Sequence, residues 1–89
     1  MNTKNQSPQF EAVRLFIDFL ANHPSDEEIL KFSFPKKIEN RVQELAIKNN
    51  AGTITADELV ELREYERLDV YGGLLKTKIM QRQKQSVPA

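Results

Sequence analysis

The sequence predicts a mostly α-helical protein with three main helices. Apolar residues recur at helical spacing in three segments, a glycine follows the second segment, and a capping box precedes the third. These observations place the helices at about 8–21, 35–49 and 56–83, with a short strand or turn at 29–34. The second and third helices should form an antiparallel helix-turn-helix hairpin at 35–83, and the first should lie on them or on a second copy of the chain.

Length and composition indicate one small domain. We expect a single helical domain at 7–83, with flexible ends at 1–6 and 84–89. A domain of this size buries only about 60–65% of the surface that its unfolded chain exposes, so its stability should be shared with a partner. The chain has no Cys, no apolar run near the roughly 20 residues that cross a bilayer, and no signal-like start. These features predict a cytoplasmic protein that does not enter a membrane.

The first predicted helix begins at Pro8 after the N-cap Ser7, because proline at the first helical position loses no hydrogen bond. Phe19 falls outside its apolar face, and residues 22–24 end the helix. A face this apolar must pack on another element. It carries five residues at helical spacing: Phe10, Val13, Phe16, Ile17 and Leu20.

The next segment carries two signals. Ser25 and Glu28 form a capping box, which predicts a helical turn. Leu30, Phe32 and Phe34 alternate with polar residues, as in a strand. A turn of helix followed by a short extended piece reconciles the two signals.

The second predicted helix has an apolar and a charged side. Glu44 and Lys48 stand outside in the favourable i, i+4 order, and Gly52 supplies the left-handed residue that commonly closes a helix. Its apolar face is formed by Ile38, Val42, Leu45 and Ala46.

The start of the third helix is the strongest local signal in the chain. Thr55 and Glu58 form a second capping box, and Ile54 before the cap is spaced to pack on Leu59 as a hydrophobic staple. The same residues fix where the chain turns between the second and third helices.

Farther along the third helix, a seam with 3–4 spacing suits a helical partner. We expect this seam to bind a partner protein and to form a homo-oligomer, a dimer. Gly72 and Gly73 cost the helix about 2 kcal/mol relative to two alanines. They indicate either a break in the helix, which we favour, or the close approach of another backbone. The predicted partner-binding residues are Tyr65, Leu68, Tyr71, Gly72, Leu75 and Ile79.

Charge is distributed unevenly although the net charge is zero. Residues 51–71 are mainly acidic, whereas residues 72–89 carry bases and no acid. Acids favour a helix N-terminus and bases a C-terminus, which explains the asymmetry without a ligand. The alternative interpretation is a basic tail that contacts phosphate or an acidic partner.

The residues available for catalysis are few, and we predict no enzyme, no cofactor and no metal. His23 is the single histidine and stands at a helix end, where a capping role is expected. The stretch "NAGTITADEL" resembles the second half of an EF-hand calcium loop, with Gly52 and Glu58 at the matching places. Its first half lacks oxygen donors, because Ile47 and Ala51 occupy two ligand positions.

A second resemblance is to ribbon-helix-helix DNA-binding proteins, carried by "LKFSFPKKIENRVQELAIKNN" and "TADELVELREYERL". It implies a dimeric transcriptional regulator in which Lys31 and Ser33 contact the DNA major groove from a two-stranded ribbon. Asp57, Glu58 and Glu61 crowd the helix end that would face phosphate in this family. This function is the alternative to the one we favour.

The third resemblance covers most of the chain after residue 29. The pattern "R-V-x-E-L…N-x-G-T-[IL]-T-x-x-E…E-L…Y…L-L…K" is similar to that of short, uncharacterised bacterial proteins, some of them antitoxin-like neighbours of toxin nucleases. The resemblance implies a small helical partner protein. With the seam, it leads us to expect a non-enzymatic interaction module that binds a partner through its long C-terminal helix.

Overall fold

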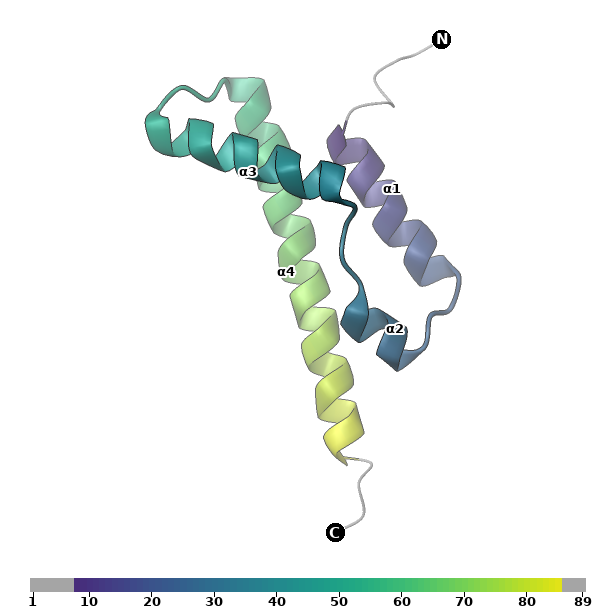
Figure 1. The fold of residues 1–89 in the computed structure, drawn as a ribbon. Helices are drawn as coiled ribbons and strands as arrows, with labels where there is room; N and C mark the ends of the chain where they lie inside the picture. The colour runs from purple at the N-terminus through teal and green to yellow at the C-terminus, as the bar shows by residue number, and fades with distance from the viewer. Residues whose placement is uncertain (1–7, 86–89) are drawn as a thin grey trace.

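The computed structural model describes residues 8–85, and over that range the chain forms four helices and no strand (Figure 1). The mostly α-helical fold class and the three main helices are confirmed. A fourth, short helix lies between the first and second predicted helices, in the segment whose sequence carries both a helical and a strand-like pattern. The helices are α1 (Pro8–Ala21), α2 (Asp26–Lys31), α3 (Lys36–Ala51) and α4 (Ala56–Gln85).

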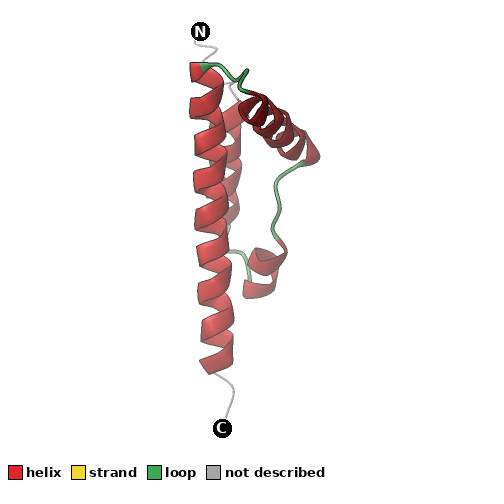
Figure 2. Ribbon diagram, turned by 90° about the vertical axis from the view of Figure 1, so that its left-hand side faces the viewer, coloured by secondary structure: helices red, strands yellow, loops and turns green. Residues whose placement is uncertain are grey.

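The long helix α4 is the spine of the fold, because α1, α2 and α3 each pack against it. Helix α1 runs alongside α4 in the same direction, α2 lies beside the C-terminal half of α4, and α3 crosses the N-terminal half obliquely (Figures 1 and 2). The first helix therefore lies on its own chain. The predicted antiparallel hairpin is only partly correct: the chain turns where expected, but α3 does not lie along α4.

The turn between α3 and α4 is built from the residues that predicted it. Gly52 adopts a left-handed conformation with φ +76°, and its N–H donates to the Asn49 carbonyl oxygen at 3.2 Å. The Thr55 N–H donates to Glu58 Oε1 at 3.0 Å, and the Glu58 N–H donates to Thr55 Oγ1 at 3.1 Å. Ile54 packs against the core. The backbone of this turn is thus hydrogen-bonded by carbonyl groups of α3 at its start and by the side chains of Thr55 and Glu58 at its end.

Helix α1 packs on the core through only part of the face that its large apolar residues predict. Val13 and Phe16 of that face pack against the buried cluster. Phe10 and Ile17 are exposed, Ile17 by 56%. The predicted face is therefore correct in part.

Two residues outside that face also contribute to the packing of α1. Ala12 is fully buried, and a small residue suits the position where α1 approaches the rest of the core. Phe19 contacts the Phe32 ring at a centroid distance of 4.4 Å.

Helix α2 begins at the expected capping box, with the Ser25 N–H donating to Glu28 Oε1 at 2.7 Å. Phe32 ends the helix in an extended conformation, and residues 32–35 form a link to α3. The helical turn followed by an extended piece is confirmed. A strand does not form, because within residues 8–85 the link has no second strand to pair with.

The core lies where α1, α3 and α4 meet. The predicted core residues Ile38 and Leu45 are buried and Val42 packs against them, as expected for α3. Glu44 and Lys48 do not pair with each other as predicted: Glu44 pairs with Arg41, and Lys48 crosses to Glu58. The buried cluster consists of Ala12, Ile38, Leu45, Leu62, Tyr65 and Leu68.

Helix α4 continues without interruption through Gly72 and Gly73, so the break that we favoured from sequence is wrong. Packing holds both halves: Leu68 is buried before the glycines, and Ile79 is buried after them. Such tertiary contacts override the low helix propensity of glycine. The alternative explanation also fails within this chain, because a Cβ added at either glycine would meet no atom within 4 Å.

The molecule is elongated for its size. Its radius of gyration is 16.0 Å, against about 12 Å for a compact domain of 89 residues. None of the helices in the described part of the chain is long and apolar enough to span a bilayer. The predicted cap Ser7 and the ends at 1–6 and 86–89 lie outside the described residues, while residues 84 and 85 belong to α4.

Candidate binding groove

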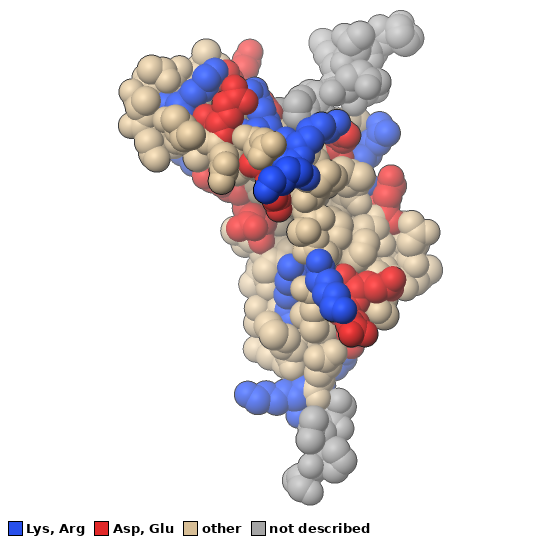
Figure 3. All heavy atoms as spheres, in the orientation of Figure 1, with Lys and Arg blue, Asp and Glu red and all other residues tan. Residues whose placement is uncertain are grey.

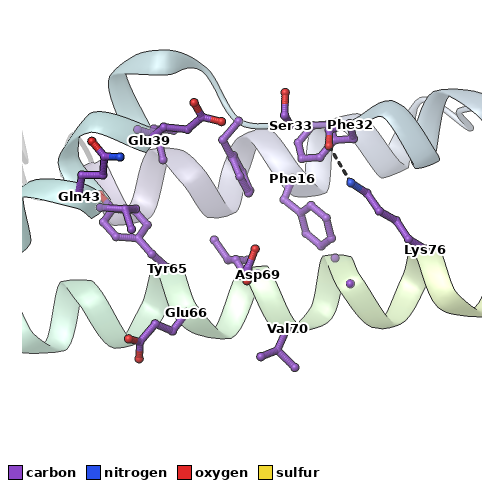
Figure 4. A pocket seen from close by; sticks show the side chains of 16 residues that line it. Phe16, Phe32, Ser33, Glu39, Gln43, Tyr65, Glu66, Asp69, Val70 and Lys76 are labelled. Carbon is purple, nitrogen blue, oxygen red and sulfur yellow. Dashed lines mark hydrogen bonds between the residues drawn. The ribbon is translucent and has the colours of Figure 1, made fainter. Parts of the chain in front are cut away.

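An open groove beside the middle of α4 is the candidate functional site. It has a volume of about 810 Å³ and lies between α4, the link at 32–34 and the N-terminal half of α3 (Figure 4). Phe16 enters it from α1, which lies behind (Figure 4). Because residues of α1, α3, α4 and the link all contribute, the groove exists only in the folded chain. We call it the phenylalanine groove.

Three phenylalanine rings give the groove its apolar wall. The Phe32 ring contacts both other rings, with centroid distances of 5.9 Å to Phe16 and 5.1 Å to Phe34. Phe34 also approaches Phe16 at 6.3 Å. These separations lie within the range in which aromatic pairs contribute about 0.5–1.5 kcal/mol beyond the burial of their area. The wall is therefore preformed, although all three rings remain partly exposed.

The opposite wall of the groove contains Gly72 and Gly73. Neither glycine has a neighbour within 4 Å of the position that a Cβ would occupy. Beside them, Lys76 Nζ donates a hydrogen bond of 3.0 Å to the Phe32 carbonyl oxygen and ties the link to α4 (Figure 4). A partner backbone could therefore approach α4 closely at the two glycines, where no side chain intervenes.

The polar residues at the rim are mainly acidic. Glu39 and Gln43 stand at the α3 end, and Asp69 stands on α4, while Glu66 and Val70 lie on the outer side of α4 (Figure 4). An uncharged band separates the charged residues over α3 from those over α2 (Figure 3). The groove thus offers an apolar surface bordered by negative charge.

A buried ionic network braces the crossing of α3 and α4 beside the groove. Arg41 Nε and Nη2 donate to the two carboxylate oxygens of Glu61, each at 2.8 Å. The Tyr65 hydroxyl donates to Glu61 Oε2 at 2.8 Å. Glu61 is only 6% exposed. Three charge-assisted hydrogen bonds compensate its burial.

These contacts change the acidity of each group in the network. Hydrogen bonds from Arg41 lower the pKa of Glu61, although burial opposes the shift. Burial raises the pKa of Tyr65, and the hydrogen bond to Glu61 adds to that effect. The carboxylate of Glu61 also raises the pKa of Arg41. At neutral pH the network is a fixed ion pair with a protonated tyrosine, an arrangement suited to holding two helices together.

The calcium-loop resemblance falls on a second ion pair. Glu58 uses Oε1 to accept from the Thr55 N–H, and its Oε2 accepts from Lys48 Nζ at 2.7 Å. The hydrogen bond from Lys48 is the main reason that the pKa of Glu58 is lowered to about 2. Both oxygens of this carboxylate are therefore engaged within the chain. In the described residues no group of three His, Asp or Glu side chains gathers to hold a metal.

The six predicted partner-binding residues do not share one surface. Tyr65, Leu68 and Ile79 are buried by the chain's own helices, so this part of the prediction is wrong. The seam repeats with helical spacing because it packs inside the chain. Gly72 and Leu75 are half-buried, and Tyr71 is 52% exposed on another side of α4. Of the six, only Tyr65, Leu68 and Gly72 line the phenylalanine groove.

The two residues expected to contact DNA lie in different elements. Lys31 belongs to α2, where its Nζ lies 3.5 Å from Glu27 Oε2, and Ser33 is in the link, at the groove. A two-stranded ribbon would need both residues in one strand, which residues 8–85 do not form.

Sequence reasoning missed the convergence of Phe16, Phe32 and Phe34. The signal available was the abundance of phenylalanine, five in 89 residues, but the contact between these three depends on how α1 and the link pack on α4.

His23 is exposed in the α1–α2 connection, where its backbone N–H donates to the Leu20 carbonyl oxygen at 3.1 Å. Comparison of the chain with protein-family models, curated proteins and solved structures finds no match.

Proposed function

We propose that the protein is a non-enzymatic interaction module that binds a helix of a partner protein in the phenylalanine groove. The observation that carries the proposal is the pairing of a partly exposed aromatic wall with two glycines at which an added Cβ would meet no atom within 4 Å. Helix-in-groove recognition uses this combination of an apolar trough and close backbone approach. Such binding requires no catalytic group.

Energetics favour a partner on this surface. The two glycines lower the stability of α4 by about 2 kcal/mol relative to alanines, and no atom of the chain lies within 4 Å of the positions that their Cβ atoms would occupy. Covering the rings of Phe32 and Phe34 would remove apolar surface from water at about 25 cal/mol per Å². The rest of the chain covers these two rings only in part.

The charge at the rim limits the chemistry of the partner. Glu39 and Asp69 border the apolar wall, so a fitting helix carries apolar residues on one face and Lys or Arg at its edge. A toxin nuclease, the kind of neighbour that the antitoxin-like resemblance implies, is one class of protein that could present such a helix.

Affinity purification with matched variants tests this proposal. A tagged chain should retain a stoichiometric protein partner, and Gly72→Leu should abolish its retention by filling the groove. Ile47→Ala is the control, because Ile47 is 69% exposed on α3 and does not line the groove. Equal retention by wild type and Gly72→Leu, or no retained protein at all, would contradict the proposal.

A further inference from the structure

We infer that α4 of a second copy of this chain packs antiparallel against the outer side of α4, beside the phenylalanine groove. The inference goes beyond the proposed function, because this contact leaves the groove itself open. It is carried by one row of residues, which we call the α4 seam. The α4 seam consists of Glu66, Val70, Gly73, Thr77, Met80 and Lys84.

The α4 seam has the spacing of a helix–helix contact, and all its residues are exposed in the single chain. Its members are separated by 4, 3, 4, 3 and 4 residues, the alternation that keeps one side of a helix facing another helix. Val70 is 57% exposed and Met80 is 53% exposed. Between them Gly73 leaves open space where a side chain would stand.

The sequence of the α4 seam is complementary to itself when reversed. An antiparallel pair centred near residue 75 places Glu66 beside Lys84 of the second copy, Val70 beside Met80, and Gly73 beside Thr77. Opposite charges meet at both ends, and the smallest residue lies near the crossing point. A parallel pair would instead place each Glu66 beside another Glu66, with like charges in contact. The charge pattern therefore selects the antiparallel arrangement.

The fold leaves room for the second helix. Helix α3 reaches α4 through the ion pairs of Arg41 with Glu61 and of Lys48 with Glu58, all before the α4 seam begins. Glu66 already accepts a hydrogen bond from Arg63 at 2.9 Å, but both side chains are about half exposed. Because such a surface pair contributes little, Glu66 is free to contact a second base.

Two-fold symmetry makes this contact isologous, so each copy presents the same row of residues to the other. Val70 points to the outer side of α4, away from the phenylalanine rings (Figure 4), and the antiparallel register places Met80 of the second copy beside it. Pairing these two exposed side chains removes apolar surface from water. The contact therefore lies beside the phenylalanine groove and leaves its aromatic wall open.

Single cysteines test the register, since the chain has no cysteine of its own. With a short bis-maleimide, Thr77→Cys should cross-link to itself, whereas Lys84→Cys should not, because the two Lys84 positions lie about 27 Å apart along the axis. A mixture of Glu66→Cys and Lys84→Cys chains should cross-link. Self-linking of Lys84→Cys without linking in the mixture would indicate a parallel pair and overturn the inference.

Charge reversal tests the complementarity independently. Glu66→Lys and Lys84→Glu should each raise the dissociation constant of the dimer about tenfold, a change of about 1.4 kcal/mol. The double variant should restore the wild-type value, because the pairs re-form with exchanged signs. Sedimentation equilibrium measures these constants, with Ile47→Ala as the unaffected control. Failure of the double variant to recover would overturn the inference.

The two proposals fail in different ways. A chain that stays monomeric at every concentration, yet retains another protein that Gly72→Leu releases, overturns the pairing of two α4 helices and leaves the proposed function standing. A monomeric chain that retains no protein overturns both. Circular dichroism should show that Gly73→Leu remains helical while it abolishes the dimer, so that loss of binding is separated from loss of fold.

Discussion

Tyr65 and Glu61 lie one turn apart on α4, and the tyrosine hydroxyl donates a 2.8 Å hydrogen bond to the glutamate carboxylate inside the protein. The same carboxylate receives both Arg41 bonds from α3. A buried charge with three donors is stable, but removal of one donor leaves a polar group that water cannot reach. This network therefore makes the crossing of the two helices sensitive to single substitutions.

Loss of Arg41 should destabilise the fold more than loss of the Tyr65 hydroxyl. Arg41→Met leaves the Glu61 carboxylate buried without its counter-ion and should lower the free energy of unfolding by about 3 kcal/mol. Tyr65→Phe removes one hydrogen bond to a charged group and should cost about 1.5 kcal/mol. Urea unfolding followed by circular dichroism measures both values.

The control for this comparison is Arg63→Met, because Arg63 pairs with Glu66 on the solvent-exposed side of α4. Its expected cost is under about 0.5 kcal/mol. If Arg63→Met proved as costly as Arg41→Met, burial of Glu61 would not be the reason for the sensitivity.

Acid should destabilise the protein through Glu58. Its folded-state pKa of about 2 lies below the ordinary value of 4.5, so between these values the unfolded chain binds more protons than the folded chain. The free energy of unfolding must then fall as the pH falls from about 4.5 toward 2. The lowered pKa of Glu61 acts in the same direction. Thermal unfolding at a series of pH values measures the slope.

Lys48→Met should flatten this acid dependence, because the hydrogen bond from Lys48 is the largest cause of the Glu58 shift. Lys78→Met makes the same chemical change at an exposed position of α4 and should leave the slope unchanged. Equal slopes in the wild type and Lys48→Met would show that the ion pair does not form in solution.

The helix boundaries could be predicted because their causes are local. Both capping boxes and the left-handed Gly52 depend on residues within one turn, and the predicted start of α4 at 56 is the observed one. What could not be predicted depends on tertiary approach. Ala12 rather than Ile17 enters the core, and Glu61 is buried because Arg41 reaches it from another helix.

The groove was beyond sequence reasoning for the same reason. The 3–4 repeat around Leu68 predicts a contact face correctly, but periodicity alone does not distinguish a face covered by the same chain from one that awaits a partner. Helices α1 and α3 cover that face in the folded chain. The side of α4 that stays uncovered has fewer apolar residues and is centred on Gly73, which has no side chain and so adds nothing to a hydrophobic pattern.

Thr55→Ala should lower the free energy of unfolding by about 1 kcal/mol, because it removes the hydroxyl that caps α4. The Glu58 N–H would lose its 3.1 Å acceptor at the start of the helix that all other helices contact. Ser25→Ala breaks the equivalent bond in α2, and hydrogen exchange should detect a local opening of α2 with a smaller global loss. Equal global losses would contradict the role of α4 as the spine.

Gly72→Ala and Gly73→Ala should each stabilise the folded monomer, which is the opposite of the usual effect of a substitution. Alanine is favoured over glycine in a helix by about 1 kcal/mol, and the added methyl groups would meet no atom within 4 Å. The gain should appear in urea unfolding at protein concentrations below the dissociation constant of the dimer. At higher concentrations Gly73→Ala should weaken the dimer, because the methyl group occupies the space that Thr77 of the second copy needs.

Gly52→Ala is the matched control, since it makes the same chemical change at φ +76°. An L-residue in that conformation costs about 1 kcal/mol, so this variant should be destabilised. Destabilisation by Gly52→Ala together with stabilisation by Gly73→Ala would show that the backbone conformation requires glycine at position 52, whereas the fold does not need glycine at position 73. If Gly73→Ala destabilised the monomer as much as Gly52→Ala, the glycine would serve folding itself, and its link to partner binding would lose its basis.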